Sequence, residues 1–326
     1  MNLTTQADVV IVGCGAGGLA TAVELLLNAP ELRVLVLERT TRARRGGNTA
    51  WTGSFFRLDE DGAPAADFTE RMRTLSRGKT DEAIIHRLAE LAQPTMRWLN
   101  DQGVATKADT TYFLTSRGPR LMPDGGGAAI VETLASRFEA LGGTIEYETA
   151  AQALLMGPED AVAGVEVSGA GTARTIATST VVLASGGFEG NSALLNRYLG
   201  ARGHELPTIT PGGRSNQGEG IEMAKQVGAG CDGQFDRFHG EPVDPRSGIG
   251  EALVMVYPYG VLVDHRGQRF LDEGSDPGQH VRVGRVPNLG RGRPVRLRHR
   301  RPEADAAEYC PRRPDRPKTG ERGHDQ

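Results

Sequence analysis

The sequence predicts an α/β protein built on a doubly wound parallel sheet. An apolar, β-branched run within residues 8–12 leads directly into a glycine-rich turn, and a second apolar run lies at residues 34–37. Such runs are typical of central parallel strands that are covered on both faces. Between them, residues 17–27 carry apolar side chains at helical spacing. The three segments predict one right-handed βαβ unit.

The rest of the chain predicts an inserted helical segment and a small β-rich layer. Residues 43–53 are interpreted as a glycine-rich loop. Helices are expected at residues 68–77, 82–100, 128–141, 193–199 and 220–227, the second of them interrupted or bent at Pro94. Strands are expected at residues 144–149, 162–168, 173–178, 181–184, 261–263 and 269–271, with a hairpin between the second and third.

Composition limits the classes of protein. A chain of 326 residues is long enough for one large domain or two ordinary ones. Its three cysteines, Cys14, Cys231 and Cys310, fit neither a disulfide framework nor a metal-ligand spacing, as expected of a protein in the reducing cytoplasm. No apolar run is long enough for a signal-peptide core or an integral membrane segment. A soluble cytoplasmic protein is therefore expected, and the cysteine spacing predicts no metal site.

The last part of the chain differs from the rest. Residues 281–326 hold 13 Lys and Arg against 6 Asp and Glu, whereas the whole chain has a net charge of −3. Three interpretations stand beside one another: a nucleic-acid or membrane-surface segment, a disordered extension, and the product of a shifted reading frame or truncated gene. The absence of aromatic interleaving and of apolar periodicity disfavours nucleic acid and favours an aberrant, unstructured tail.

Residues 13–18 (GCGAGG) fit the pattern G-x-G-x-x-G, which is weak by itself in a chain with 44 glycines. A preceding buried strand, a following helix and Glu38 at the end of the next strand make the pattern specific for a dinucleotide. Gly13 allows the tight turn, Gly15 lets the backbone approach a pyrophosphate, and Gly18 lets helix and strand pack closely. Glu38 is suited to ribose hydroxyls. The alternative is a glycine-rich turn of an unrelated α/β protein.

Three further segments favour FAD over the shorter NAD. Residues 45–53 (RGGNTAWTG) follow the second strand, residues 184–188 (ASGGF) follow a later one, and residues 217–220 (QGEG) open a helix. Each alone is typical of an ordinary turn. Together they predict several backbone approaches to one extended ligand.

These motifs resemble those of the fumarate reductase/succinate dehydrogenase flavoprotein family, and most of all its soluble members of the tricarballylate dehydrogenase kind, over about residues 7–273. The resemblance implies cofactor roles for Glu38-Arg39, for residues 46–49 and 184–188, and for residues 218–224, where Glu219 replaces the usual aspartate. The early loop has no histidine for a covalent flavin bond, so FAD should bind non-covalently. The predicted cofactor-binding residues are Gly13, Gly15, Gly17, Gly18, Glu38, Arg39, Arg45, Gly46, Gly47, Asn48, Thr49, Thr52, Gly53, Ala184, Ser185, Gly186, Gly187, Gly218 and Glu219.

The resemblance also implies a substrate site under a capping domain. His239 falls where the family has a histidine near the start of that domain, although a purely structural histidine is an equal alternative. Glu251 resembles a family acid of a proton path, but no arginine follows it within residues 252–260. His239 and Glu251 are the predicted substrate-binding residues, and no catalytic residue is assigned. Arg269 is interpreted as supporting the fold.

The expected organisation is a Rossmann-like FAD-binding domain at residues 1–236, the start of an incomplete α+β capping domain at 237–280, and the basic tail at 281–326. The expected function is hydride transfer between flavin and a carbon–carbon bond of a small, carboxylate-bearing substrate, with an unidentified electron acceptor. Two alternatives stay open: a 3-oxosteroid dehydrogenase-like flavoprotein, and a catalytically inactive flavin-binding remnant.

Overall fold

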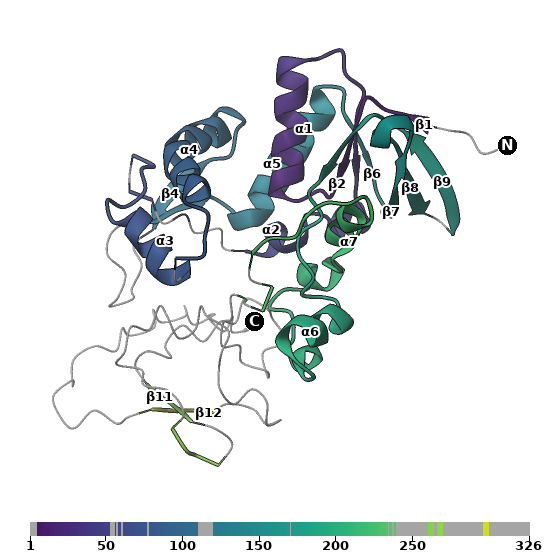
Figure 1. Cartoon of the computed structure of the whole chain (residues 1–326). Helices are drawn as coiled ribbons and strands as arrows, with labels where there is room; N and C mark the ends of the chain where they lie inside the picture. Colours follow the sequence, from purple (N-terminus) through teal and green to yellow (C-terminus); the bar gives the residue numbers. More distant parts are fainter. Residues whose placement is uncertain are drawn as a thin grey trace, which may run out of the picture.

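The structure is a computed structural model that describes residues 5–52, 56, 58–59, 61–76, 78–109, 120–169, 171–233, 235–236, 238, 260–263, 266–269 and 296–299. Its centre is a four-stranded parallel sheet in the order β10-β2-β3-β6 (Figure 1). The strands are β2 (Val9–Val12), β3 (Val34–Leu37), β6 (Thr144–Glu146) and β10 (Thr180–Leu183). The parallel α/β class predicted from the sequence is therefore confirmed.

The two central strands are buried on both faces because alternate side chains enter different hydrophobic layers. Val9 and Ile11 belong to the core on the helical side, whereas Val10 and Val12 belong to the core on the opposite side. All four residues of β2 and of β3 are buried. This two-sided burial is the reason why both segments are continuous apolar runs in the sequence.

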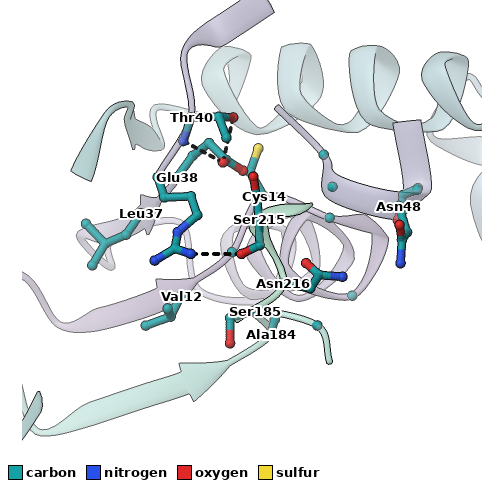
Figure 2. A pocket seen from close by; sticks show the side chains of 18 of the residues that line it. Val12, Cys14, Leu37, Glu38, Thr40, Asn48, Ala184, Ser185, Ser215 and Asn216 are labelled. Atoms are coloured by element: carbon teal, nitrogen blue, oxygen red, sulfur yellow. Dashed lines mark hydrogen bonds between the residues drawn. The ribbon is translucent and has the colours of Figure 1, made fainter. Parts of the chain in front are cut away.

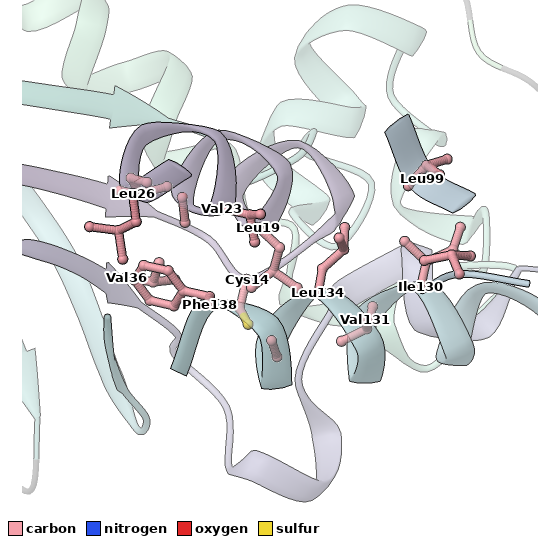
Figure 3. Close-up of a cluster of buried hydrophobic side chains, with 14 of the residues drawn as sticks. Cys14, Leu19, Val23, Leu26, Val36, Leu99, Ile130, Val131, Leu134 and Phe138 are labelled. Atoms are coloured by element: carbon pink, nitrogen blue, oxygen red, sulfur yellow. The ribbon is translucent and has the colours of Figure 1, made fainter. Parts of the chain in front are cut away.

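Helices α1 (Ala16–Asn28) and α5 (Gly126–Ala140) cover one face of the parallel sheet (Figure 1). Figure 3 shows Leu19, Val23 and Leu26 of α1 beside Leu134 and Phe138 of α5 in one buried cluster. Full burial of a side chain the size of leucine or phenylalanine stabilises a fold by about 1.5–3 kcal/mol relative to exposure. The βαβ unit is thus held by a dense apolar layer.

A second sheet covers the other face, in the order β1-β9-β8-β7 (Figure 1). Its strands are β1 (Thr5–Gln6), β7 (Thr149–Met156), β8 (Val162–Gly169) and β9 (Thr172–Ala177). The predicted hairpin is confirmed, since β8 and β9 pair antiparallel. The single strand predicted at residues 144–149 is wrong: the chain turns at Glu148, whose φ is 54°, and enters β7 in the second sheet.

The predicted loop at residues 43–53 is also wrong in part. A 3₁₀ helix η1 (Arg42–Arg44) and a short helix α2 (Gly47–Trp51) occupy it. Helix α4 (Glu82–Asp101) continues through Pro94 without interruption. The remaining elements are α3 (Phe68–Ser76), β4 (Thr106–Asp109), β5 (Arg120–Pro123), η2 (Pro158–Asp160), α6 (Ser192–Leu199), η3 (Gly203–Glu205), η4 (Gly212–Ser215), α7 (Glu219–Gln226), β11 (Gly260–Val263) and β12 (Arg296–His299).

Strand β12 lies within the segment for which an unstructured tail is expected, and it pairs antiparallel with β11. At these four residues the structure differs from the expectation, because a backbone ladder does not require apolar side-chain periodicity. The division at residues 236, 280 and 326 stays a prediction. No helix in the described ranges is long and apolar enough to cross a membrane.

Candidate functional site

A cavity of about 300 Å³ opens at the carboxyl ends of β2, β3 and β10 (Figure 2). Ligands of open parallel α/β sheets bind outside the carboxyl ends of the strands, where loops from several strands meet. The lining residues that had been predicted from the sequence are Gly13, Gly15, Gly17, Glu38, Arg39, Gly46, Gly47, Asn48, Thr49, Ala184, Ser185, Gly186, Gly187 and Glu219. Five segments of the chain, at residues 13–17, 38–39, 46–49, 184–187 and 219, therefore share one cavity.

The turn after β2 is tight because backbone approaches backbone on both sides of it. A β-carbon on Gly13 would lie 2.4 Å from the carbonyl oxygen of Ala184, and Gly13 has a φ of 112° that favours glycine. A β-carbon on Gly18 would lie 2.0 Å from the carbonyl oxygen of Gly13. The first and last glycines of the motif thus serve packing, which is the role predicted for Gly18.

The middle of the same turn faces the cavity. Gly15, the N-cap of α1, lies in extended backbone with no side-chain cap, and the first turn of α1 contains no acidic residue. A β-carbon on Gly15 would meet only ordinary contacts, the nearest being Thr49 Oγ1 at 3.5 Å. The positive end of the α1 dipole therefore points into a space that suits an anion such as a phosphate.

Glu38 stands at the end of β3, where only 6% of the residue is exposed. Its Oε1 accepts hydrogen bonds from the backbone nitrogen of Thr40 at 2.9 Å and from Thr40 Oγ1 at 2.8 Å (Figure 2). Within the described part of the chain both bonds go to Oε1. The carboxylate is thereby held in one orientation, with Oε2 left for hydroxyl donors of a ligand.

The second glycine loop is pressed onto helix α5. Gly46 has a φ of 95°, and a β-carbon there would lie 2.7 Å from Val131 Cγ2. The loop is also joined to the first turn, because Thr49 Oγ1 accepts a hydrogen bond of 3.1 Å from the backbone nitrogen of Ala16. Asn48 Oδ1 accepts one of 2.6 Å from Thr210 Oγ1. Helix α2, which begins at Gly47, is therefore held in place against α5, against the first turn and against Thr210.

The third glycine turn meets a residue that the sequence reasoning missed. Gly186 has a φ of 77°, and a β-carbon there would lie 2.9 Å from the side-chain amide of Asn216. Asn216 is buried and donates to Glu189 Oε1 at 2.7 Å, and Asn48 donates to the same oxygen. The further lining residues that were missed are Val12, Cys14, Ala16, Leu37, Thr40, Thr149, Ala150, Ala151, Ser215 and Asn216. Val12, Cys14 and Ala16 adjoin predicted glycines, and Leu37 and Thr40 adjoin Glu38 and Arg39; the other five adjoin no predicted residue.

Arg39 and Glu219, both predicted from the sequence, contact each other. Arg39 Nη2 forms an ion pair with Glu219 Oε1, and Arg39 Nη1 donates 2.8 Å to the carbonyl oxygen of Ser215. Glu219 is the first residue of α7 and follows Gly218, whose φ is 83°. The second residue after β3 is thereby joined to the start of α7.

Four predicted residues lie outside the cavity lining. Arg45 turns into the protein, where its side chain is 2% exposed and pairs with Glu132 at 2.7 Å and with the Tyr147 hydroxyl at 2.8 Å. Gly18 packs within the turn, and Gly218 packs beneath Leu194 and Phe188. Thr52 is exposed at the end of α2. Gly53, His239 and Glu251 lie outside the described residues.

Cys14 lies in the first turn and is buried. Burial, reinforced by the negative charge of Glu38, raises the pKa of its thiol to about 12. The thiol is therefore protonated at neutral pH and is a poor nucleophile. In the described ranges no group of three or more His, Cys, Asp or Glu side chains could hold a metal ion.

The shape and donors of the cavity fit an elongated dinucleotide. At Gly13 and Gly186 an added β-carbon would collide with neighbouring atoms, so backbone itself forms these parts of the wall. A helix N-terminus and a buried carboxylate then lie in the same cavity, which matches a pyrophosphate beside a ribose. The backbone amides at the N-terminus of α1 would offset the charge of a pyrophosphate here.

Comparison with known proteins gives the same picture. Residues 8–294 match the family described as FAD binding domain. Vinyl phenol reductase of Lactiplantibacillus plantarum is 26% identical over 284 residues, which are 82% of this chain and 56% of that protein. NADH:fumarate oxidoreductase of Klebsiella pneumoniae is 26% identical over 277 residues, 82% of this chain and 29% of that protein. The chain thus spans little more than half, or less, of these relatives.

Solved structures share the fold. The 3-ketosteroid-Δ4-(5α)-dehydrogenase of Rhodococcus jostii RHA1 has a TM-score of 0.62 and 25% identity, over 86% of this chain and 63% of the other. A flavocytochrome c3 fumarate reductase has a TM-score of 0.68 and 20% identity, over 82% of this chain and 49% of the other.

Proposed function

Because the chain belongs to the FAD binding domain family, we propose that it is the flavin-binding part of an FAD-dependent oxidoreductase acting on a carbon–carbon bond of a small substrate. The convergence of three glycine turns and Glu38 on one cavity carries the proposal. Separate turns of an unrelated protein have no reason to meet at one sheet edge.

Each part of the cavity has a role toward FAD. Oε2 of Glu38 would accept hydrogen bonds from the adenosine ribose, and the first-turn amides of α1 would receive the pyrophosphate. Gly46, Gly47 and Gly186 would let the backbone approach the remainder of the cofactor. When bound, FAD supplies the hydride acceptor or donor, while the protein orients the reactants and excludes competing reactions.

The substrate we propose is carboxylate-bearing, as in tricarballylate dehydrogenase-like enzymes. Two relatives support it by their names, the NADH:fumarate oxidoreductase already described and urocanate reductase of Eggerthella lenta, which is 27% identical over 285 residues. His239 and Glu251 remain the proposed substrate-binding residues, with an electron acceptor still to be identified.

A second candidate is a 3-oxosteroid dehydrogenase-like activity on an apolar substrate. The likeness to the Rhodococcus jostii structure supports it, because that chain is 25% identical and its match covers 86% of this one. The name of a second relative, vinyl phenol reductase, also indicates a substrate without a carboxylate. The two candidates differ in whether the substrate bears a carboxylate.

The first test is the colour of the purified protein. We expect the visible absorbance of a flavin, released from the protein by denaturation because the bond is non-covalent. A colourless protein that takes up no added FAD would contradict the proposal. With FAD bound and chemically reduced, anaerobic addition of fumarate, urocanate, a vinyl phenol or an α,β-unsaturated 3-oxosteroid then identifies the substrate class, because reduction of the substrate's C=C bond re-oxidises the flavin. A flavin-loaded protein that reacts with none of them would favour the inactive-remnant alternative.

A further inference from the structure

Three charged side chains belong to the described wall of the cavity: Glu38, Arg39 and Glu219. Glu38 accepts hydrogen bonds through Oε1 from Thr40, which lies two residues further along the chain. Arg39 is the one cation among these described lining residues, and it is paired with Glu219, 180 positions further along the chain. The charges of Arg39 and Glu219 therefore neutralise each other in the cavity wall.

The guanidinium of Arg39 makes two contacts with the wall opposite. One nitrogen pairs with the Glu219 carboxylate, and the other donates 2.8 Å to the Ser215 carbonyl oxygen. Because a guanidinium is planar and rigid, its side chain loses little conformational entropy for each hydrogen bond that it forms. The side chains of Arg39 and Glu219 are 29% and 33% exposed, so solvent screens the pair less than a fully exposed one.

The pair adds a link between two segments that also share the core, since Met223 of α7 packs in one buried cluster with Leu35 and Leu37 of β3. Arg39 follows β3 and so moves with the parallel sheet, whereas Ser215 and Glu219 end η4 and begin α7. Both segments line the cavity. An unpaired carboxylate at position 219 would also repel a pyrophosphate, and Arg39 offsets that charge.

We propose that Arg39 and Glu219 form an ionic clasp that joins the two cavity walls and slows the release of FAD. The inference rests on the proposed function, because it needs FAD in this cavity. A dinucleotide held between the end of β3 and the first turn of α7 leaves when that turn opens, so breaking the pair lowers the barrier to release.

The test is the rate of FAD release, followed by the rise in flavin fluorescence after dilution into an excess of a flavin-scavenging apoprotein. The variants are Arg39→Gln, Glu219→Gln and the double variant. Each single variant should release FAD about threefold to tenfold faster than wild type. The double variant should be no faster than the faster single one, because both substitutions remove the same interaction.

The matched control is Arg33→Gln. Arg33 forms an ion pair of 2.7 Å with Asp8 and does not line the cavity. Its loss removes an arginine and an ion pair while leaving the cavity intact, so the release rate should equal that of wild type.

Three results would overturn the clasp: unchanged release in both single variants, effects that multiply in the double variant, or slower release in Glu219→Gln together with faster release in Arg39→Gln. The last result would mean that each charge acts on FAD separately. Hydrogen exchange at the first turn of α7 in the FAD-free protein is the second readout, and it should quicken in both single variants. Unchanged exchange contradicts the clasp, whereas a wild-type protein that binds no FAD contradicts the proposed function.

Discussion

A β-carbon placed on Gly18 would lie 2.0 Å from the carbonyl oxygen of Gly13. No pair of non-bonded carbon and oxygen atoms tolerates that separation, and the obstacle is backbone rather than a flexible side chain. Helix α1 therefore lies close to the turn from which it starts because position 18 has no side chain. Gly18 thus supports the cavity without lining it, whereas its neighbour Gly13 is a lining residue.

Gly18→Ala should destabilise the fold, since either α1 or the turn must shift. Overpacking of this kind costs about 1–3 kcal/mol. The matched control is Gly17→Ala, one residue earlier in the same helix, where a β-carbon would meet nothing within 4 Å. Alanine at that helical position should be neutral or stabilise by up to about 1 kcal/mol. Urea unfolding of both variants measures the difference, and equal stabilities would refute the packing role of Gly18.

Gly15→Val should separate binding from folding. The nearest atom to a β-carbon on Gly15 is Thr49 Oγ1 at 3.5 Å, an ordinary contact, and Gly15 already has extended backbone that valine adopts readily. The valine methyl groups would nevertheless fill space where backbone should approach the pyrophosphate. We expect a folded protein by circular dichroism and loss of flavin absorbance. Flavin content at the wild-type level would show that Gly15 does not face the cofactor.

Glu38→Gln should weaken FAD binding by about tenfold, because a charge-assisted hydrogen bond to the ribose contributes roughly 1.5–3 kcal/mol and the amide retains part of it. Titration of the apoprotein with FAD, followed by quenching of flavin fluorescence, measures the change. Glu139→Gln is the control: that carboxylate pairs with Arg42 outside the cavity and should leave the affinity unaltered. Equal affinities of wild type and Glu38→Gln would remove Glu38 from the site.

Cys14 should resist alkylation in the folded protein, since burial raises the pKa of its thiol to about 12. Cys231 is exposed and should react readily. Mass spectrometry of peptides after brief iodoacetamide treatment at mildly alkaline pH distinguishes the two, and rapid native-state labelling of Cys14 would contradict its burial.

The same shift predicts a pH dependence of stability. The thiol ionises more easily in the unfolded chain, whose pKa is near the ordinary value of 9.0. The stabilising effect of the neutral buried thiol is therefore complete below pH 9.0 and is lost as the pH rises toward 12. Cys14→Ala should flatten this alkaline decline in urea unfolding experiments, and an unchanged decline would assign it to other groups.

Much of the fold could be predicted because its signals are local. β2 and β3 are apolar on both faces, and the β8–β9 hairpin has glycines at its turn. β7 was missed because its alanine-rich sequence has no β-branched residue after Thr149, and its place depends on pairing with β8. Helix α2 was missed because residues 46–49 contain glycine, a poor helix former that here is held by packing on α5.

The candidate site shows the same division. The sequence by itself determined where backbone must approach backbone or ligand, since Gly13, Gly15 and Gly18 belong to one turn of six residues with Glu38 at a fixed spacing. Only the tertiary structure decided that Arg45 turns away from the cavity, that Asn216 supports Gly186, and that Arg39 meets Glu219. The physical reason is the separation of the interacting residues along the chain. A turn or strand is determined by neighbouring residues, whereas an ion pair between residues 180 positions apart forms only when the packed layers bring the two side chains together.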